Sequence, residues 1–319
     1  MKIKNDEAGR LDAILSKHLQ EPRNQVEKLI KNIGVLVDGA LVKKGSKKLE
    51  GDEVIEYEFV KAQKAKESYE VDFEVEILYE DEHLLVVNKP PFLTVHPAPS
   101  VKEVTLVDWL IKKGVSLSTI SGEERHGIVH RIDKETSGAL VVAKSNEAHL
   151  KLSAQLEDKS MGRYYLALVD LPLKQDEIVE KPIGRNASNR LKMAVVATGR
   201  YAKSAFSKLC LSKDEKVELL SIKLFTGRTH QIRVHLNSLS RHILGDSLYG
   251  FKSQNSKISR VMLHAYIIYF QHPITGEKMQ VTAPLFEDFK EILEKHFQKD
   301  CIDEKLNENF IISHFNSFC

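Results

Sequence analysis

The chain has 319 residues, of which 42% are hydrophobic, and its 47 basic and 45 acidic residues give a formal net charge of +2. This composition excludes a disordered chain and provides enough apolar residues for two folded domains. The balanced charge excludes a uniformly basic protein, so any surface that binds nucleic acid must be local.

The three cysteines, Cys210, Cys301 and Cys319, are an odd number and have no short spacing. This argues against a disulfide framework or a cysteine-based zinc site and favours a reducing compartment. The first residues lack the apolar core of a signal peptide, and no run is long enough to cross a bilayer. We therefore expect a cytoplasmic protein with no membrane partner.

Residues 1–60 have the pattern of a small α/β domain. Apolar residues at helical spacing predict one helix from about Leu11 and a second helix after Pro22. Asp38 and Gly39 stand between two short apolar stretches, which is a strong signal for a two-residue hairpin turn. A further turn at residues 51–52 precedes an alternating stretch that predicts a strand.

Basic residues are concentrated in this domain, since residues 10–48 hold nine Lys or Arg against four Asp or Glu. Such a cluster can follow a phosphate backbone, although a solvated basic face explains it equally well. The candidate RNA-binding residues are Arg10, Arg23, Lys28, Lys31, Lys43 and Lys44. The order of the two helices, the hairpin and the turns resembles the ribosomal-protein S-four-type RNA-binding module, from which Pro22 and Asp38 are small departures.

The polar residues 61–72 are expected to form a linker, and the pattern of a second, larger domain covers residues 73–298. Its predicted strands are 75–79, 84–88, 127–129, 139–143, 163–169, 219–225, 261–270 and 278–283, and its predicted helices are 105–114, 145–161, about 232–239 and 286–297. Residues 172–203 are irregular and basic, and the C-terminal tail at 299–319 has little pattern.

The most informative stretch is the polar loop at residues 130–138, which lies between two apolar strands. Rigid scaffolds commonly present functional side chains on such loops. Asp133 is the central candidate because Arg131 and Lys134 flank it. The simpler interpretation is a turn in which the carboxylate accepts local backbone N–H groups.

Histidine spacing does not favour a metal site. His126 and His130 are four residues apart on a strand-like segment, and His230 and His235 are five apart, which places them on different faces of a helix. No phosphate-binding loop or dinucleotide fingerprint is present. We therefore expect neither a metal nor a cofactor.

A carboxylate, an arginine and a tyrosine remain as candidates for chemistry. Arg233 could pair with Asp133 and keep it ionised and oriented, although a surface cation is an equal alternative. Tyr165 could stack on an unpaired base, although ordinary strand packing is the more common role of such a residue.

The loop sequence, with His130, Arg131 and Asp133 followed by Thr136-Ser-Gly138, resembles the signature of the RluA-type pseudouridine synthases. Further stretches match this family in one order across residues 75–297, at 87–90, 95–97, 165–169, 182–185, 192–195, 227–233, 245–246, 263–265, 272–273 and 283–284. Ile132 and Ser204 depart from the residues usual in the family.

The resemblance implies an α+β fold, in which the catalytic domain at residues 73–298 has a mixed, largely antiparallel sheet flanked by helices. It implies that Asp133 is the essential aspartate, that Arg131 displaces the target base, that Tyr165 lies beneath the uracil and that Arg233 pairs with the aspartate. His130, Thr136, Arg228 and His230 are expected to contact the substrate.

These observations predict a monomeric enzyme that isomerises uridine to pseudouridine in RNA. Large-subunit ribosomal RNA is the first choice of substrate, because members of the family with the N-terminal module mostly act there, and transfer RNA is the second. The main rival is a non-catalytic RNA-binding or ribosome-assembly factor. A hydrolytic metalloenzyme is disfavoured by the histidine spacing.

Overall fold

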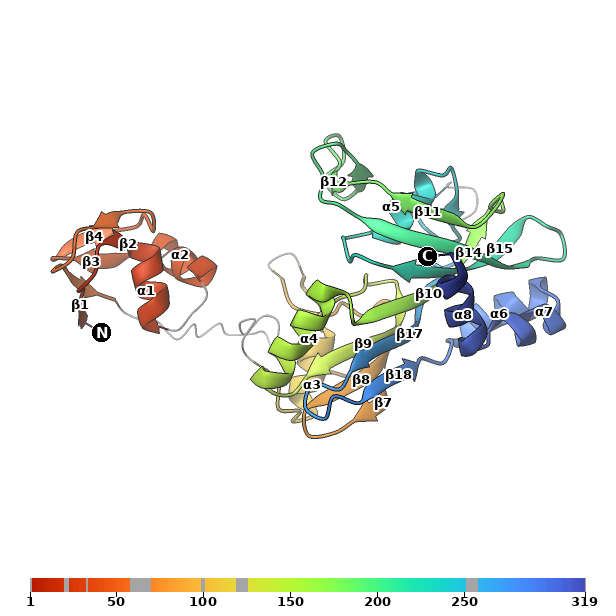
Figure 1. Ribbon diagram of the computed structural model, residues 1–319, viewed down its shortest axis with the longest axis horizontal. Coiled ribbons are helices and arrows are strands. Elements are labelled where there is room, and N and C mark those ends of the chain that lie inside the picture. The colour runs from red at the N-terminus through yellow and green to blue at the C-terminus, as the bar shows by residue number, and fades with distance from the viewer. Residues whose placement is uncertain are drawn as a thin grey trace. The chain divides into compact units, whose positions relative to one another are not determined.

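The computed structural model describes residues 2–19, 23–32, 34–57, 70–98, 101–118, 126–250 and 258–318. The chain divides into two compact units, Met1–Ser68 and Tyr69–Cys319, which are described separately below (Figure 1). Within the described ranges, no helix is both long enough and apolar enough to span a membrane.

The N-terminal unit packs two helices, α1 (Leu11–Leu19) and α2 (Arg23–Asn32), with short strands. Its four-stranded sheet has the order β1 (Lys2–Lys4), β6 (Val54–Glu56), β3 (Val35–Val37) and β4 (Ala40–Val42), and β2 (Gly9–Arg10) pairs with β5 (Lys48–Leu49). The β3–β4 turn has positive φ at both Asp38 (50°) and Gly39 (79°). This is the backbone of a two-residue hairpin that matches strand twist, as the sequence predicts.

The larger unit is organised around one sheet of ten strands among the residues described. Its main order is β11 (Glu177–Glu180), β14 (Lys203–Leu211), β15 (Val217–Leu224), β10 (Gly162–Asp170), β17 (Leu263–Gln271), β9 (Ser137–Ala143), β8 (Leu84–Lys89) and β7 (Glu76–Glu80). In addition, β16 (His242–Ile243) pairs with β10, and β18 (Lys278–Thr282) pairs with β17. The β9–β17 pair is parallel and the other pairs described are antiparallel, which confirms the predicted fold class.

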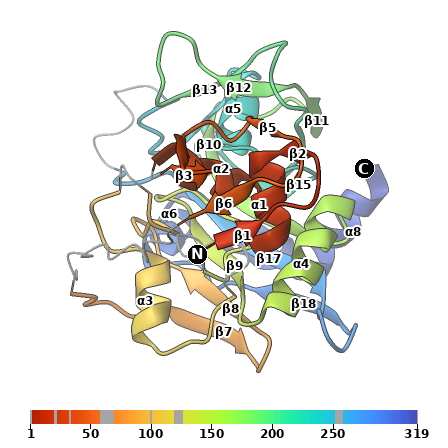
Figure 2. The ribbon, with the colours of Figure 1, turned by 90° about the vertical axis from the view of Figure 1, so that its left-hand side faces the viewer.

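Helices cover both faces of the sheet at β8 and β9, and Figure 2 shows α3 and α4 on opposite sides of these strands. Alternate residues of β8 explain this: Leu85 and Val87 pack with α3 (Leu106–Lys112), whereas Leu84 and Val86 pack with α4 (Asn146–Asp158). Burial of each such side chain contributes roughly 1.5–3 kcal/mol. The two-sided burial makes these strands continuous apolar runs and holds the polar segment before β9 in a fixed place.

Two predictions for this unit are wrong. Among the described residues, 127–129 are not part of a strand, because a single isolated bridge, Ile128 to Val142, joins this segment to β9. Residues 172–203 are not simply irregular, since they contain β11 and the hairpin of β12 (Ile183–Arg185) with β13 (Met193–Val195). These strands are too short to produce a clear periodicity in the sequence.

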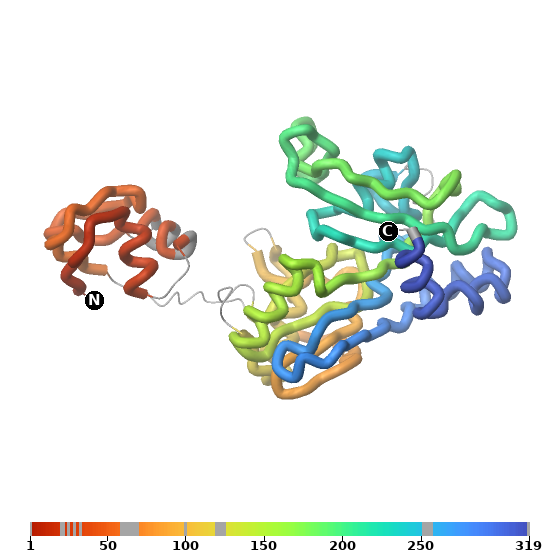
Figure 3. The backbone as a smooth tube through the Cα atoms, in the orientation of Figure 1, coloured from red at the N-terminus to blue at the C-terminus, as the bar shows by residue number. Residues whose placement is uncertain are grey.

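The C-terminal residues also differ from the prediction of a tail with little pattern. After α6 (Glu287–His296), α7 (Lys299–Lys305) and α8 (Glu308–Phe318) return to the sheet near β14, as the blue end of the tube in Figure 3 shows. Ile311 and Phe315 of α8 are fully buried. A disulfide joins Cys210 of β14 to Cys301, 91 residues later, contrary to the expectation of unpaired cysteines. Only the tertiary return of α7 brings the two sulfurs together, so no spacing rule could reveal the pair.

Candidate active site

One cavity of about 490 Å³ in the larger unit collects the residues singled out from the sequence. It is bounded by the loop before β9, the start of β10, the end of β15, and the turn that leads into α5 (Gln231–Asn237). All eight predicted catalytic and substrate-contacting residues line it: His130, Arg131, Asp133, Thr136, Tyr165, Arg228, His230 and Arg233. Segments that are far apart in the sequence therefore meet at one place.

The Asp133 loop is fixed by hydrogen bonds at several points. The Thr136 amide donates to the Asp133 carbonyl (3.2 Å), which closes the turn. The Val141 amide donates to Nε2 of His130 (3.1 Å), so this ring is tied to β9. The Val261 amide donates to the Glu135 carboxylate (3.3 Å). The loop thus holds the Asp133 side chain, which is partly exposed, at the cavity wall.

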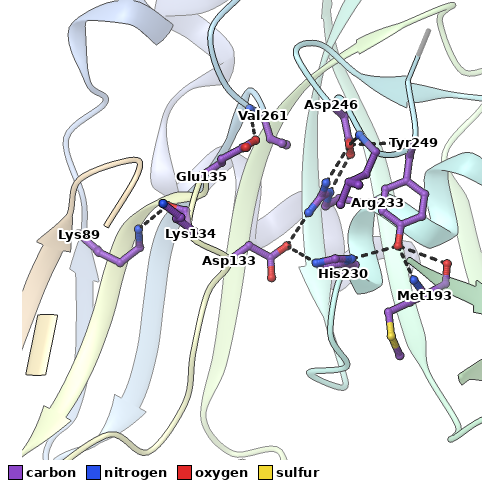
Figure 4. Close-up of polar contacts among 11 residues, drawn as sticks. Lys89, Asp133, Lys134, Glu135, Met193, His230, Arg233, Asp246, Tyr249 and Val261 are labelled. Carbon is purple, nitrogen blue, oxygen red and sulfur yellow. Dashed lines mark hydrogen bonds and ion pairs between the residues drawn. The ribbon is translucent and has the colours of Figure 1, made fainter. Parts of the chain in front are cut away.

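Lys89 also anchors this loop. The sequence did not indicate that this lysine is buried there. Its side chain is fully buried, and Nζ donates to the carbonyls of Pro90 (2.7 Å), Leu93 (2.9 Å) and Lys134 (3.0 Å). Burial lowers the pKa of Lys89 to about 7, and the nearby Asp133 charge partly opposes this shift. The contact with Lys134 is drawn in Figure 4.

Arg233 lies between two carboxylates (Figure 4). Its Nε and Nη2 donate to Oδ2 and Oδ1 of Asp246 (2.7 and 2.8 Å), and its Nη1 donates to Oδ2 of Asp133 (3.1 Å). Burial acts to lower the pKa of Arg233, but its bonds to Asp246, with a smaller effect of Asp133, raise it overall. The predicted contact between Arg233 and Asp133 is therefore present, and Asp246 is an additional partner.

His230 approaches the same oxygen of Asp133, with Nε2 at 3.9 Å from Oδ2. Its Nδ1 is 3.0 Å from the hydroxyl of Tyr249, which in turn contacts both the amide and the carbonyl of Met193. Burial lowers the pKa of His230, although Asp133 opposes the shift. His230 itself has a positive φ of 55° at the start of α5, and Figure 4 shows its ring between Asp133 and Tyr249.

Oδ1 of Asp133 differs from Oδ2, because no hydrogen bond or ion pair to Oδ1 occurs among the residues that the structure describes. A carboxylate held through one oxygen can present the other to a bound molecule. Asp133 is also the one carboxylate among the described lining residues, against six basic side chains: Arg131, Lys159, Arg163, Lys223, Arg228 and Arg233. The cavity is therefore suited to a ligand with negative charge.

Tyr165 is buried on β10, and burial raises the pKa of its hydroxyl. The raised pKa keeps this hydroxyl protonated and disfavours a role for Tyr165 as a general base. Arg131 is exposed, whereas Thr136 is buried. The Nε of Arg228 donates to the Tyr201 carbonyl (3.0 Å), so that side chain is partly anchored.

The basic residues of the N-terminal unit fall into two groups. Arg10 and Arg23 both donate to the fully buried carboxylate of Asp12, at 2.7 and 3.1 Å. Lys31, Lys43 and Lys44 are exposed. The side chain of Lys28 lies outside the described residues. Three lysines are thus exposed and have no ion-pair partner among the described residues, while the two arginines have a structural partner that the sequence pattern did not indicate.

Comparisons with known proteins point to one family for the larger unit and to one domain type for the N-terminal unit. Residues 83–238 match the family model described as RNA pseudouridylate synthase, and residues 9–55 match the S4 domain. A Helicobacter pylori protein named "Uncharacterized RNA pseudouridine synthase" is 48% identical over 96% of this chain and 95% of its own length.

Two relatives carry a more specific name, "Ribosomal large subunit pseudouridine synthase D". The Zymomonas mobilis protein is 42% identical over 69% of this chain and 72% of its own. The Pseudomonas aeruginosa protein is 37% identical over 88% of this chain and 89% of its own. The solved structure "Human RNA Pseudouridylate Synthase Domain Containing 1" aligns with a TM-score of 0.56 and 25% identity, over 68% of this chain and 86% of that one.

Proposed function

Because this chain belongs to the RNA pseudouridine synthase family, with an N-terminal S4 domain, we propose that it converts uridine to pseudouridine in large-subunit ribosomal RNA with Asp133 as the reacting group. The relatives named for the large ribosomal subunit support this substrate over transfer RNA. The role of Asp133 is supported chiefly by one observation: among the described residues that line this basic cavity, Asp133 is the one carboxylate.

The isomerisation breaks the bond from N1 to C1′, turns the uracil, and joins C5 to C1′. C5 loses a proton and N1 gains one, so atoms and electrons balance without an oxidant or reductant. Oδ1 of Asp133 can attack C1′ or remove the 2′ proton, and both routes need the carboxylate held as it is by Arg233. Arg233 stays in place through either route because Asp246 binds its opposite edge.

The target base must leave its stack before the cavity can enclose it, which costs a few kcal/mol. We assign Arg131, exposed at the cavity, to displacing the base, and Tyr165 to contacting the flipped uracil. The raised pKa of Tyr165 favours a neutral phenol, which can stack or donate a hydrogen bond, over a role as the base at C5. His130, Thr136, Arg228 and His230 are assigned to substrate contacts from the same cavity wall.

The proposal includes binding of RNA by the N-terminal unit through its exposed lysines, action in the cytoplasm, and a monomeric enzyme. The larger unit, residues 73–298 with the two helices that follow, would carry the catalysis. The S4 match covers residues 9–55, within the proposed RNA-binding domain at residues 1–60.

Tritium release from C5-labelled uridine in ribosomal RNA tests the activity directly. The wild-type protein should release tritium, and Asp133→Asn should lower the rate by roughly a thousandfold or more, about 4 kcal/mol in the barrier, while still binding RNA. Glu135→Gln is a matched control in the same loop, because Glu135 does not line the cavity, and it should keep most of the activity.

Retained turnover in Asp133→Asn would remove Asp133 from its role. Pseudouridine mapping in ribosomal and transfer RNA from cells that lack the protein decides the substrate. A site lost from the large-subunit RNA supports the proposal, and a site lost only from transfer RNA contradicts it.

A further inference from the structure

Arg163 is a buried cation in the same cavity to which the proposed reaction assigns no role. It is the second residue of β10, two positions before Tyr165, and therefore shares a face of the strand with it. The residue is only 7% exposed, yet it lines the cavity. Its neighbours in the register are Leu224 of β15 and Ile268 of β17, which offer no charge.

Within the described residues, the guanidinium of Arg163 has no hydrogen-bond or ion-pair partner, and its Nε is a buried donor without an acceptor. The other deeply buried arginines differ, since Arg233 is bound by Asp246 and Arg260 by Asp288. A buried charge without a partner is costly, so such groups are normally paired or contact a ligand. Since no described residue provides an acceptor for Arg163, a bound ligand is the remaining source of one.

His130 is a second buried donor that lacks an acceptor among the described residues. Its Nε2 accepts the Val141 amide, so the proton of the neutral ring is on Nδ1, and Nδ1 is also buried without a partner. Burial, and then the charge of Arg163, lowers the pKa of His130 well below its usual range. The neutral ring thus presents an N–H rather than a lone pair.

The surroundings leave an anion as the missing acceptor. Asp133 is held by Arg233 through Oδ2, and no hydrogen bond or ion pair joins it to Arg163 among the described residues. Besides His130, the titratable lining groups on which Arg163 acts are the phenols of Tyr165 and Tyr269. Gly227 adjoins the guanidinium, since a Cβ built there would lie 3.5 Å from Nη2 and 3.9 Å from Nη1. The turn at residues 226–229 can therefore pass close beside the guanidinium.

We propose that Arg163, with His130 beside it, forms a phosphate subsite that binds the phosphodiester next to the flipped uridine. This proposal rests on the proposed function for the identity of the nucleotide. A guanidinium presents several N–H donors in a plane, which fits two oxygens of one phosphate better than an ammonium does. Such a contact would hold the backbone while the base turns, and it would give the buried charge its partner only when RNA is bound.

Binding of small nucleotides tests the subsite without any turnover. Uridine, uridine 5′-monophosphate and uridine 3′-monophosphate are titrated by calorimetry against the wild type, Arg163→Gln and Arg163→Lys. One of the two monophosphates should bind the wild type about tenfold tighter than uridine, or more, as expected for a hydrogen-bonded charge. Arg163→Gln should remove this gain and leave uridine binding unchanged, and Arg163→Lys should keep part of it.

Lys213→Gln is the matched control, because Lys213 is an exposed cation at the opposite end of β15 from the cavity; it should keep the full gain. Equal binding of uridine and both monophosphates to the wild type would overturn the proposal, and this result does not depend on whether any variant folds. If Arg163→Gln still binds the monophosphate more tightly than uridine by the same factor, the proposal is overturned. This holds also if the turnover rate of the variant falls, since Arg163 would then act on Tyr165 and not on a phosphate. Tritium release is measured separately, so loss of activity with an intact gain counts against the proposed function alone.

Discussion

Asp246 binds the guanidinium of Arg233 through both of its carboxylate oxygens, at 2.7 and 2.8 Å, and leaves Nη1 directed at Asp133. Both residues of this pair are nearly fully buried. Arg233 is therefore not positioned by Asp133, the residue that it is proposed to support. Its orientation is set beforehand by Asp246, which also accepts the amides of Leu248 and Tyr249.

Asp246→Asn should consequently impair the reaction although Asp246 does not line the cavity. Arg233 would lose its charged anchor and could rotate toward Asp133, so we expect kcat to fall by about a hundredfold while KM changes less. Stability in urea should drop by on the order of 3 kcal/mol, because one partner of a buried ion pair is neutralised. Wild-type kcat in a folded variant would show that Asp246 does not position Arg233.

The exposed lysines of the N-terminal unit should determine how RNA binding depends on salt. Replacing Lys31, Lys43 and Lys44 by Gln should weaken binding and reduce the slope of log affinity against log salt by about 2, at roughly 0.7 per lost phosphate contact. The control triple replaces Lys2, Lys4 and Lys17, which pair with Glu56, Asp52 and Glu7. Equal slopes in the two triple variants would argue against a role for the exposed set.

His264 should make the larger unit sensitive to acid. The fully buried ring donates from Nε2 to the Ala283 carbonyl and accepts the Ser137 hydroxyl at Nδ1, and burial lowers its pKa to about 4. In the unfolded chain, His264 takes up a proton near pH 6.5, whereas in the folded chain it does so only near pH 4. The neutral ring's contribution is therefore complete above pH 6.5 and is lost as the pH falls through 4.

This loss should amount to about 3 kcal/mol between pH 7 and pH 4. Urea unfolding across this range should show a shallower acid decline in His264→Gln, even if that variant is less stable at pH 7. His296→Gln, at an exposed position, should follow the wild type. Parallel curves for His264→Gln and the wild type would rule out this residue as the origin of the acid sensitivity.

The C-terminal helices should contribute to stability and not to catalysis. Phe315 is fully buried on α8 with its ring centroid 5.4 Å from that of Tyr164, so Phe315→Ala should cost about 3–5 kcal/mol. Thermal unfolding of Phe315→Ala and of the exposed neighbour Asn316→Ala measures the difference. The tritium-release rate per folded molecule should be equal in both. An unchanged melting temperature in Phe315→Ala would mean that α8 does not pack on the core in solution.

Much of this arrangement could be predicted because it is encoded locally. The strand of residues 139–143 and the hairpin at Asp38 and Gly39 follow from apolar runs and turn residues, and the structure contains both. The contact of Arg233 with Asp133 spans 100 positions, and it was predicted from charge and from the family resemblance.

Other features depend on burial that the sequence does not display. Lysine and arginine are normally exposed, so nothing in the sequence marks Lys89 or Arg163 as buried. Lys89 reaches the carbonyl of Lys134 only after β8 and the Asp133 loop have come together. The Cys210–Cys301 pair and the buried face of α8 likewise depend on contacts between segments that are far apart along the chain.

The place of β17 in the sheet has a consequence for how the protein is made. β17 (Leu263–Gln271) lies between β10 and β9, so the two halves of the sheet share no strand until residue 271 has left the ribosome. The N-terminal unit is complete by Ser68, and domains generally fold in order of synthesis. A growing chain should therefore have a folded N-terminal unit, able to bind RNA as proposed, well before the active site exists. Protease digestion of ribosome-stalled chains ending at residue 250 tests this order: a fragment that reaches from the N-terminus to about residue 57 should resist cleavage, and the rest should be degraded.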